Sequence, residues 1–460
     1  MVLTKMHFFI VSQIRIVCCV AGLVMISSTN SFAQSNNSSD TSQFLTLKQC
    51  IDYALVHQPA LNQSVINVSV TKLNNAINLA GWLPQVNVSG NLTHYIELPT
   101  SFIADTANPG GPPRKQRTGI ANSAVPELSV TQAIFSPSLL YAAKSSRVYV
   151  QQAQQITDST KIFVVASVSK AFYNLLLTLE QIKVLKEDTV QFAQNVADAY
   201  HQYIGGIVDE TDYEQATITL NNAKAQLRQQ NENVIPQYAT LKQLMGYQPQ
   251  RQFNVSFDTL EMMHDIAFDT TQQLQFEKRI EYKQLQTTKT LQHLVTDYYR
   301  HAFLPTVSAF YTYNYEFENN SYSNLYANAY PNSLVGLSFN VPVFTGFART
   351  HNIQKSKLQE QILNWSEVDL KSAIYSEYTS AMANYRGNLY NMEVLQQNVA
   401  MAKRVYFVVT LQYKQGLVAY LNVITAESNL ITSEINYINA LFQVLSNKID
   451  LQKSMGVISY

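Results

Sequence analysis

The same series of short motifs occurs twice along the chain, at a separation of roughly 209 to 221 residues. The four pairs keep their order: Leu83-Pro84 and Leu304-Pro305, Leu128-Ser129 and Leu337-Ser338, Gly206-Ile207-Val208 and Gly416-Leu417-Val418, Met245-Gly246 and Met455-Gly456. A chain that repeats itself over such a distance is built from two copies of one structural unit. We therefore assign residues 34–246 to a first repeat and residues 272–460 to a second, joined by a linker over 247–271.

Each repeat begins with a stretch whose apolar residues recur at helical spacing, from Leu45 to Ala80 and from about Gln272 to Phe303. Pro59 falls early in the first stretch, where a kink or a restart of the helix is expected. Both stretches end just before a Leu-Pro pair, because the residue that precedes a proline is driven out of the helical region.

Two segments in each repeat alternate apolar and polar residues, which predicts β-strands at 83–96, 125–135, 304–317 and 333–344. In the third, Tyr311, Tyr313, Tyr315 and Phe317 share one face and are expected to contact lipid. A single strand of this kind also fits a half-buried strand of a soluble sandwich. Four of them, with long polar loops at 99–123 and 318–332, favour a membrane barrel.

Long helices with almost no breaker follow the strands, at 137–204, 208–245, 346–415 and 418–455. At 1.5 Å per residue the first of them is roughly 100 Å long, which no single globular domain requires. Their apolar residues are spread among Gln, Asn, Ser and Thr, which favours packing in a cylinder of many helices. The predicted fold class is mainly α with a membrane β-barrel.

Four strands cannot close a barrel, since closed single-chain barrels begin at about eight strands. An open sheet edge in lipid would leave backbone groups unpaired, at a cost of several kcal/mol each. Several copies of the chain must therefore share one barrel. Two copies would give eight strands and three would give twelve; an eight-stranded barrel is filled by its own side chains, so a conducting pore favours three.

The N-terminus has the layout of a secretory signal peptide, with Lys5 and Arg15 before an apolar run and Ser31-Phe32-Ala33 before Gln34. We expect residues 1–33 to be removed on export, although the run also fits a retained membrane anchor. Cys50 is then the one cysteine left, which excludes an intrachain disulfide and is typical of a small buried residue. No later stretch approaches twenty consecutive apolar residues, so no transmembrane helix is expected.

Composition and motifs exclude several function classes. Charged side chains make up 14% of the chain and balance at 32 basic and 32 acidic residues, so no net field attracts nucleic acid. The sequence contains no glycine-rich phosphate loop, no Cys-x-x-Cys pair and no histidine pair at metal-ligand spacing. We expect no cofactor, no metal and no enzymatic activity.

In this order, the motifs resemble those of the TolC-like outer-membrane efflux protein family, over nearly the whole chain after the signal peptide. The resemblance rests on Leu45-Thr46-Leu47 followed by Pro59, the doubled Leu-Pro strand starts, Pro342-Val343-Phe344-Thr345-Gly346, and the Tyr-x-x-Gly turns at Tyr203 and Tyr413. It implies a homotrimer with a twelve-stranded barrel in the outer membrane of a Gram-negative bacterium and a helical tunnel through the periplasm. It also implies a periplasmic adaptor protein at the tunnel tip, an inner-membrane pump, and an equatorial position for the linker.

By the same resemblance, the periplasmic tips that dock onto the adaptor are the turns at Gly205-Gly206-Ile207 and Gly416-Leu417-Val418. Glycine at a helix end permits the left-handed turn that reverses the chain, so these residues also fit purely structural turns. Better-studied family members carry entrance aspartates at the positions occupied here by Asn422 and Thr425. Acidic residues follow the first tip instead, among them Asp209 and Asp212, where they either ring the entrance or begin a solvated helix.

The predicted function is a passive exit duct for small molecules, driven by the pump through the adaptor. Two alternatives stay open: a channel for type I protein secretion, and a periplasmic helical scaffold that conducts nothing. The alternating strands count against the scaffold, because a scaffold has no use for an apolar outer face.

Overall fold

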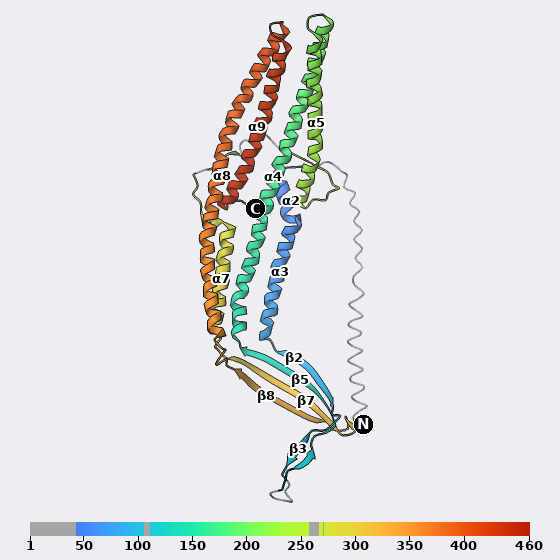
Figure 1. The fold of residues 1–460 in the computed structure, drawn as a ribbon, viewed down its shortest axis with the longest axis vertical. Coiled ribbons are helices and arrows are strands. Elements are labelled where there is room, and N and C mark those ends of the chain that lie inside the picture. The colour runs from blue at the N-terminus through green and yellow to red at the C-terminus, as the bar shows by residue number, and fades with distance from the viewer. Residues whose placement is uncertain (1–42, 105–110, 257–265, 270) are drawn as a thin grey trace. The chain divides into compact units, whose positions relative to one another are not determined.

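Figure 1 shows the chain in a computed structural model, which describes residues 43–104, 111–256, 266–269 and 271–460. The chain divides into two compact units. The larger comprises residues 44–251 and 255–460 and contains every helix discussed below, and the smaller comprises residues 1–43 and 252–254. The predicted signal peptide at 1–33 lies outside the described residues.

The first predicted helix is split in two at Gln58. α2 covers Leu47–His57 and α3 covers Pro59–Leu79. Gln58 between them is extended, with ψ 122°, because the ring of Pro59 excludes the helical region for the residue before it. Cys50 in α2 has no exposed surface, which confirms the prediction of a buried cysteine.

The long helices are α4 (Pro137–Ile204), α5 (Glu210–Met245), α8 (Ala348–Lys414) and α9 (Tyr420–Met455). α4 occupies the residues expected from the sequence, whereas α5 and α9 begin later than the expected 208 and 418. Their N-cap residues, Asp209 and Ala419, have extended backbones with ψ 158° and 154°, so each helix starts only after its cap. α7 (Ile280–His301) likewise begins after an extended residue, Arg279, and not at Gln272.

Four antiparallel strands adjoin one end of α3, α4, α7 and α8 (Figure 1). They are β2 (Gln85–His94), β5 (Asn122–Phe135), β7 (Thr306–Asn319) and β8 (Tyr330–Asn340), paired in the order β2-β5-β7-β8. Each overlaps its expected segment, with ends that differ by a few residues. Among the described residues the sheet is not closed, since β2 and β8 each pair along one side only.

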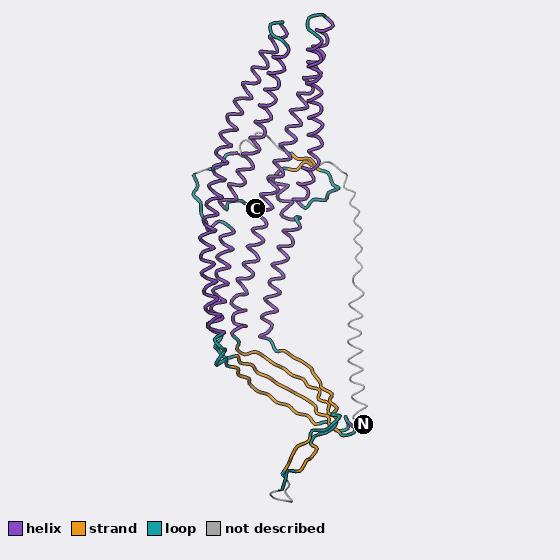
Figure 2. The backbone as a smooth tube through the Cα atoms, in the orientation of Figure 1, coloured by secondary structure: helices purple, strands orange, loops and turns teal. Residues whose placement is uncertain are grey.

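The helices nearest the sheet lie in the same succession as the strands. α3 packs against α4, α4 against α7, and α7 against α8, as Figure 2 shows. α3 leads into β2, β5 leads into α4, α7 leads into β7, and β8 leads into α8. We call this layer of four helices and four strands the wall. Its two free edges are formed by α3 with β2 and by α8 with β8.

Beyond the wall the chain forms two helical hairpins, α4 with α5 and α8 with α9, which we call the tip hairpins (Figure 1). α4 also packs against α9, so the two hairpins contact each other. The predominance of helix confirms the mainly α class predicted from the sequence.

A short hairpin of β3 (Thr100–Ile103) and β4 (Arg114–Arg117) lies within the stretch that was expected to be a loop. All eight of these residues are exposed, so no alternation of apolar and polar residues marks the strands. Further short elements are β1 (Gln43–Leu45), β6 (Phe253–Val255), and 3₁₀ helices at Ala80–Trp82, Phe276–Lys278 and Tyr322–Asn324.

Among the described helices, α4 alone is long and apolar enough, by length and composition, to cross a membrane. This finding differs from the expectation of no such segment, because a window average tolerates interspersed polar residues and a search for consecutive apolar residues does not. Within the window, 61% of the residues are buried in the structure. Val168, Leu175 and Leu176 of α4 have no exposed surface, as is typical of a core helix.

Gly246 ends α5 in a conformation that other residues rarely adopt, with φ +67°. A Cβ atom there would lie 2.5 Å from the backbone oxygen of His57. We expect Gly246→Ala to destabilise the fold by at least about 1–3 kcal/mol, measured as a lower Tm of the purified protein.

Gly387→Ala is the matched control. Gly387 lies inside α8, and apart from the backbone of the helix itself no atom of the described residues lies within 4 Å of where its Cβ would be, so alanine there should stabilise the helix by up to about 1 kcal/mol. Equal Tm values for the two variants would contradict the account of Gly246.

Candidate functional site

One face of the four-stranded sheet is apolar across all of its strands. Cross-strand partners share a face, and Val86 pairs with Val130, Val130 with Tyr311, and Tyr311 with Val335. The face continues along the strands through Val88, Leu92, Leu128, Val307, Ala309, Tyr313, Tyr315, Phe317, Leu337 and Phe339. The side chains of Val88 and Val335 are 79% and 80% exposed, so the described part of the chain does not cover this apolar face.

The opposite face of the sheet is mainly polar. A row across the strands there joins Ser89, Glu127, Asn314 and Asn332. Two aromatic residues also lie on this face: Tyr330, which pairs with Glu316, and Phe310, whose ring lies where a side chain at Gly336 would be, 2.6 Å from the position of a Cβ atom. Apolar and polar faces of this kind are the pattern of strands that separate lipid from a watery interior.

The four residues that were expected to face lipid all lie on the apolar face. Tyr311, Tyr313, Tyr315 and Phe317 occupy alternate positions of β7, and the ring of Tyr315 contacts those of Tyr313 and Phe317. The Tyr313 hydroxyl donates a hydrogen bond of 2.8 Å to the Tyr315 hydroxyl. Their contact with lipid stays a prediction.

The two tip turns have the same backbone hydrogen bonds. Gly206 donates to the Tyr203 carbonyl at 2.9 Å, and Gly416 donates to the Tyr413 carbonyl at 2.8 Å. The next residue, Ile207 or Leu417, donates to the carbonyl of Gln202 or Gln412, at 2.9 Å in both turns. This is the Schellman arrangement, which requires a left-handed residue at the helix end.

Glycine supplies that residue in both turns, with φ +66° at Gly206 and +73° at Gly416. Gly205 is right-handed, with φ −73°, so it is not the residue that reverses the chain. Ile207 and Leu417 project from the turns with 75% and 69% of their surface exposed, and Val418 is half-buried. The tips thus expose apolar side chains at Ile207 and Leu417, and their docking onto an adaptor stays a prediction.

The entrance candidates lie on two different helices. Asn422 and Thr425 are exposed one turn apart on the same side of α9, and neither carries charge. Asp209 is the N-cap of α5, and Asp212 lies half-buried in its first turn. Burial, followed by the charge of Asp209, raises the pKa of Asp212. The role of all four residues at an entrance stays a prediction.

A small core joins the tip hairpins just behind the turns. Ala199, Ala216, Tyr420 and Val423 are buried together, one from α4, one from α5 and two from α9. Beside them the Tyr413 hydroxyl of α8 donates to Gln202 Oε1 of α4 at 2.6 Å. This bond ties one hairpin directly to the other.

We expect Tyr413→Phe to loosen the two tip hairpins by about 1 kcal/mol, because it removes the hydroxyl and leaves the packing of the ring. Disulfide trapping between cysteines placed on α4 and α8 near the turns measures the change, with slower trapping expected in the variant. Tyr203→Phe is the control, since among the described residues its hydroxyl forms no hydrogen bond to the other hairpin. Equal trapping rates in Tyr413→Phe and the parent chain would contradict the expectation.

The sequence patterns did not indicate a second contact between the tip hairpins, which is polar and buried. Glu427 of α9 accepts hydrogen bonds from Asn195 Nδ2 of α4 at 2.9 Å and from the Tyr406 hydroxyl of α8 at 3.1 Å. Asp188 of α4 lies close enough for its charge to raise the pKa of Glu427. The heptad spacing from Asp188 to Asn195 on α4 was the available signal, but carboxyl and amide groups on a long helix are usually solvated.

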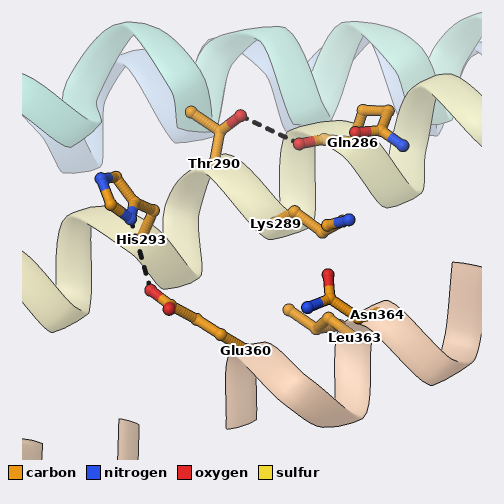
Figure 3. A pocket seen from close by; sticks show the side chains of 7 residues that line it. All are labelled: Gln286, Lys289, Thr290, His293, Glu360, Leu363 and Asn364. Carbon is orange, nitrogen blue, oxygen red and sulfur yellow. Dashed lines mark hydrogen bonds and ion pairs between the residues drawn. The ribbon is translucent and has the colours of Figure 1, made fainter. Parts of the chain in front are cut away.

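A pocket of about 370 Å³ opens between α7 and α8, as Figure 3 shows. Its lining includes Lys289, His293 and Glu360, and His293 Nδ1 lies 3.3 Å from Glu360 Oε1. Lys289 Nζ lies 2.6 Å from Glu367, and the bonds from Lys289 and Lys371 lower the pKa of that carboxyl to about 2. The contacts from Lys289 and His293 hold α7 to α8 and so belong to the wall. The part of the chain that is described contains no group of three or more residues suited to a metal.

Comparison with known proteins agrees with this geometry. The solved structure of CusC superposes with a TM-score of 0.71 and 16% identity, covering 92% of this chain and 95% of that chain. The outer membrane protein VceC from Vibrio cholerae gives 0.68 and 15%, covering 89% and 96%, and the Campylobacter jejuni CmeC outer membrane channel gives 0.68 and 17%, covering 89% and 85%. At these identities the likeness shows the fold. A comparison with curated protein sequences finds no match.

The family model described as outer membrane efflux protein matches residues 50–247 and 296–457, well over half of the chain. The matched segments include both tip turns, α4, α5, α8 and α9, and all four strands of the sheet. The chain therefore belongs to the outer membrane efflux protein family.

Proposed function

We propose that three copies of this chain form an outer-membrane channel that serves as the passive exit duct of a tripartite efflux system. The observation that carries the proposal is the pair of free edges of the wall. Each edge consists of a strand with an open side and a helix with an exposed apolar stripe that points away from its own wall.

On one edge, α3 faces α4 through polar contacts. Asn75 Nδ2 donates to the Ser146 carbonyl at 2.7 Å, and Thr157 Oγ1 donates to the Ser64 carbonyl at 3.3 Å. At 3.6 residues per turn, the exposed apolar residues lie about half a turn away, on the opposite side of the helix. They are Ile66, Val70, Leu73 and Ile77.

On the other edge, α8 faces α7 in a similar way. Gln292 Nε2 donates to Ser356 Oγ at 2.9 Å, and Thr296 Oγ1 donates to Glu360 at 2.7 Å. The exposed residues on the opposite side are Leu358, Ile362 and Trp365, and Trp365 is 74% exposed. Both stripes have the 3–4 spacing with which helices pack side by side.

Joining one edge to the other closes a ring. β8 and α8 of one copy would lie beside β2 and α3 of the next, a head-to-tail contact that closes by rotation. Three copies would supply twelve strands, enough for a water-filled interior, with the apolar face toward lipid and the polar face inside. The matching hydrogen bonds of the two tip turns support the further proposal that residues 34–246 and 272–460 are copies of one unit.

Family membership supports an outer-membrane location, with the helical part in the periplasm. The exposed tips at Ile207 and Leu417 would then dock onto a periplasmic adaptor protein joined to an inner-membrane pump. The chain itself would supply no energy and no catalysis, and Asn422 and Thr425 would line the entrance with neutral groups.

Protein secretion through the same duct is the second candidate. A strain that lacks the chain separates the two functions: retention of small molecules in the cell favours efflux, and loss of an exported protein favours secretion.

The experiment that tests the channel is the oligomeric mass of detergent-extracted, signal-processed protein, together with its single-channel conductance in a planar bilayer. A trimer with discrete conductance steps is expected. A soluble monomer with no conductance would replace the channel with a periplasmic scaffold.

A further inference from the structure

A layer of polar side chains lies within the apolar contact between the two tip hairpins. The small core behind the turns, with Ala199 and Val423, and a second core, with Phe192 and Leu220, both contact Val196, and Phe192 lies between Asp188 and Asn195 on α4. The layer draws on three helices and consists of Asp188 and Asn195 from α4, Lys403 and Tyr406 from α8, and Glu427 and Glu434 from α9. The two α4 residues and the two α9 residues are each seven apart, so each pair shares one helix face.

Two of the three carboxyl groups in this layer, Asp188 and Glu427, are incompletely satisfied. Glu427 is 3% exposed, and only one of its oxygens has hydrogen-bond partners, Asn195 and Tyr406. Its Oε2 atom and the Oδ2 atom of Asp188 are shut off from solvent and have no hydrogen-bond partner among the described residues. An ionised carboxylate in such a place is unfavourable, whereas a protonated carboxyl group can donate a hydrogen bond.

The charges that face the layer do not compensate these two groups. Glu187 on α4 and Glu434 on α9 add negative charge beside Asp188. Lys403 on α8 supplies positive charge, but it is held 2.9 Å from Glu434. From α5, the contacts behind the layer are Leu220 and Ala223, which carry no charge.

We propose that Asp188 and Glu427 form a proton-operated latch between the tip hairpins, which holds them together when both carboxyl groups are protonated and releases them when both are ionised. The pKa of each group is raised to about 7, chiefly by burial, and the charge of Asp188 adds to the shift of Glu427. The carboxyl groups of Asp188 on α4 and Glu427 on α9 therefore ionise over the same pH range, within the contact between the tip hairpins.

The direction of the pH dependence follows from linkage. An exposed carboxyl group ionises near pH 4, so between about pH 4 and pH 7 the joined hairpins bind more protons than the separated ones. The equilibrium constant for association of the two tip hairpins therefore falls as pH rises through this window, by up to about tenfold per pH unit for each group. Above about pH 7 it no longer changes with pH.

The test measures the distance between the hairpins by spin labels on Gln226 of α5 and Gln397 of α8, both exposed. The native cysteines are replaced by alanine, and labelled chains are diluted with unlabelled ones. We expect the distance to increase between pH 5 and pH 8 in the parent chain and to stay constant in the Asp188→Asn, Glu427→Gln double variant. Glu232→Gln, at a solvent-exposed pair with Arg228 on α5, is the control and should behave like the parent.

The latch would be overturned if the distance between the labels in the parent chain did not change with pH. It would also be overturned if this distance increased equally in the double variant. Its effect on conduction rests on the proposed function, so bilayer conductance is recorded at the same pH values. A distance that changes with pH in a protein without conductance would support the latch and contradict the channel. Conductance in a protein whose distance does not change with pH would support the channel and contradict the latch.

Discussion

Tyr313→Arg is expected to keep the protein out of the membrane. Tyr313 lies near the middle of β7 on the apolar face, between Leu128 of β5 and Ser333 of β8. An arginine on the lipid side of a barrel costs about 2–4 kcal/mol at the membrane midplane, and a trimer would carry three of them. Membrane fractionation and refolding into lipid vesicles measure the loss.

Thr312→Arg is the matched control, one residue away on the opposite face. It should insert as the parent does, because its charge would meet water, and it should shift conduction toward anions. Equal loss of insertion in both variants would show that the chemistry of the sheet faces does not decide membrane contact.

Ile362→Glu is expected to convert the trimer to monomers. Ile362 lies on the exposed stripe of α8, which in the proposed ring would be covered by α3 of the neighbouring copy. Burying an unpaired carboxylate in an apolar contact costs several kcal/mol, and the ring contains three such contacts. The oligomeric mass in detergent measures the result.

Asn364→Asp is the control on the same helix, since Asn364 lines the pocket between α7 and α8 instead of the free edge. A variant that stays trimeric is expected there. Ile66→Lys on α3 should dissociate the trimer as Ile362→Glu does, because both residues lie roughly 20 Å along their helices from the sheet. If the chain with both Ile362→Glu and Ile66→Lys partly recovers the trimer, the two side chains are in contact across the interface. An Ile362→Glu chain that stays fully trimeric would contradict the proposed ring.

Sequence alone predicted the features that depend on neighbouring residues. The break at Gln58 is set by the ring of Pro59, and the reversals at Gly206 and Gly416 are set by a left-handed residue that only glycine adopts readily. Alternation along β7 assigned Tyr311 and Tyr313 to one face, because successive strand residues point in opposite directions. The hairpin of β3 and β4 gave no such signal, because both of its faces are exposed.

Tertiary structure decided what depends on residues far apart in the chain. The order β2-β5-β7-β8, and with it the identity of the free edges, follows from pairing between the two halves at Tyr311 and Val130. Asn195 and Glu427 meet although 232 residues separate them, and nothing local to either residue indicates this contact. Periodicity assigns a side chain to one face of its own helix or strand, but only packing against distant elements determines whether that face meets water, lipid, another helix or an unpaired carboxyl group.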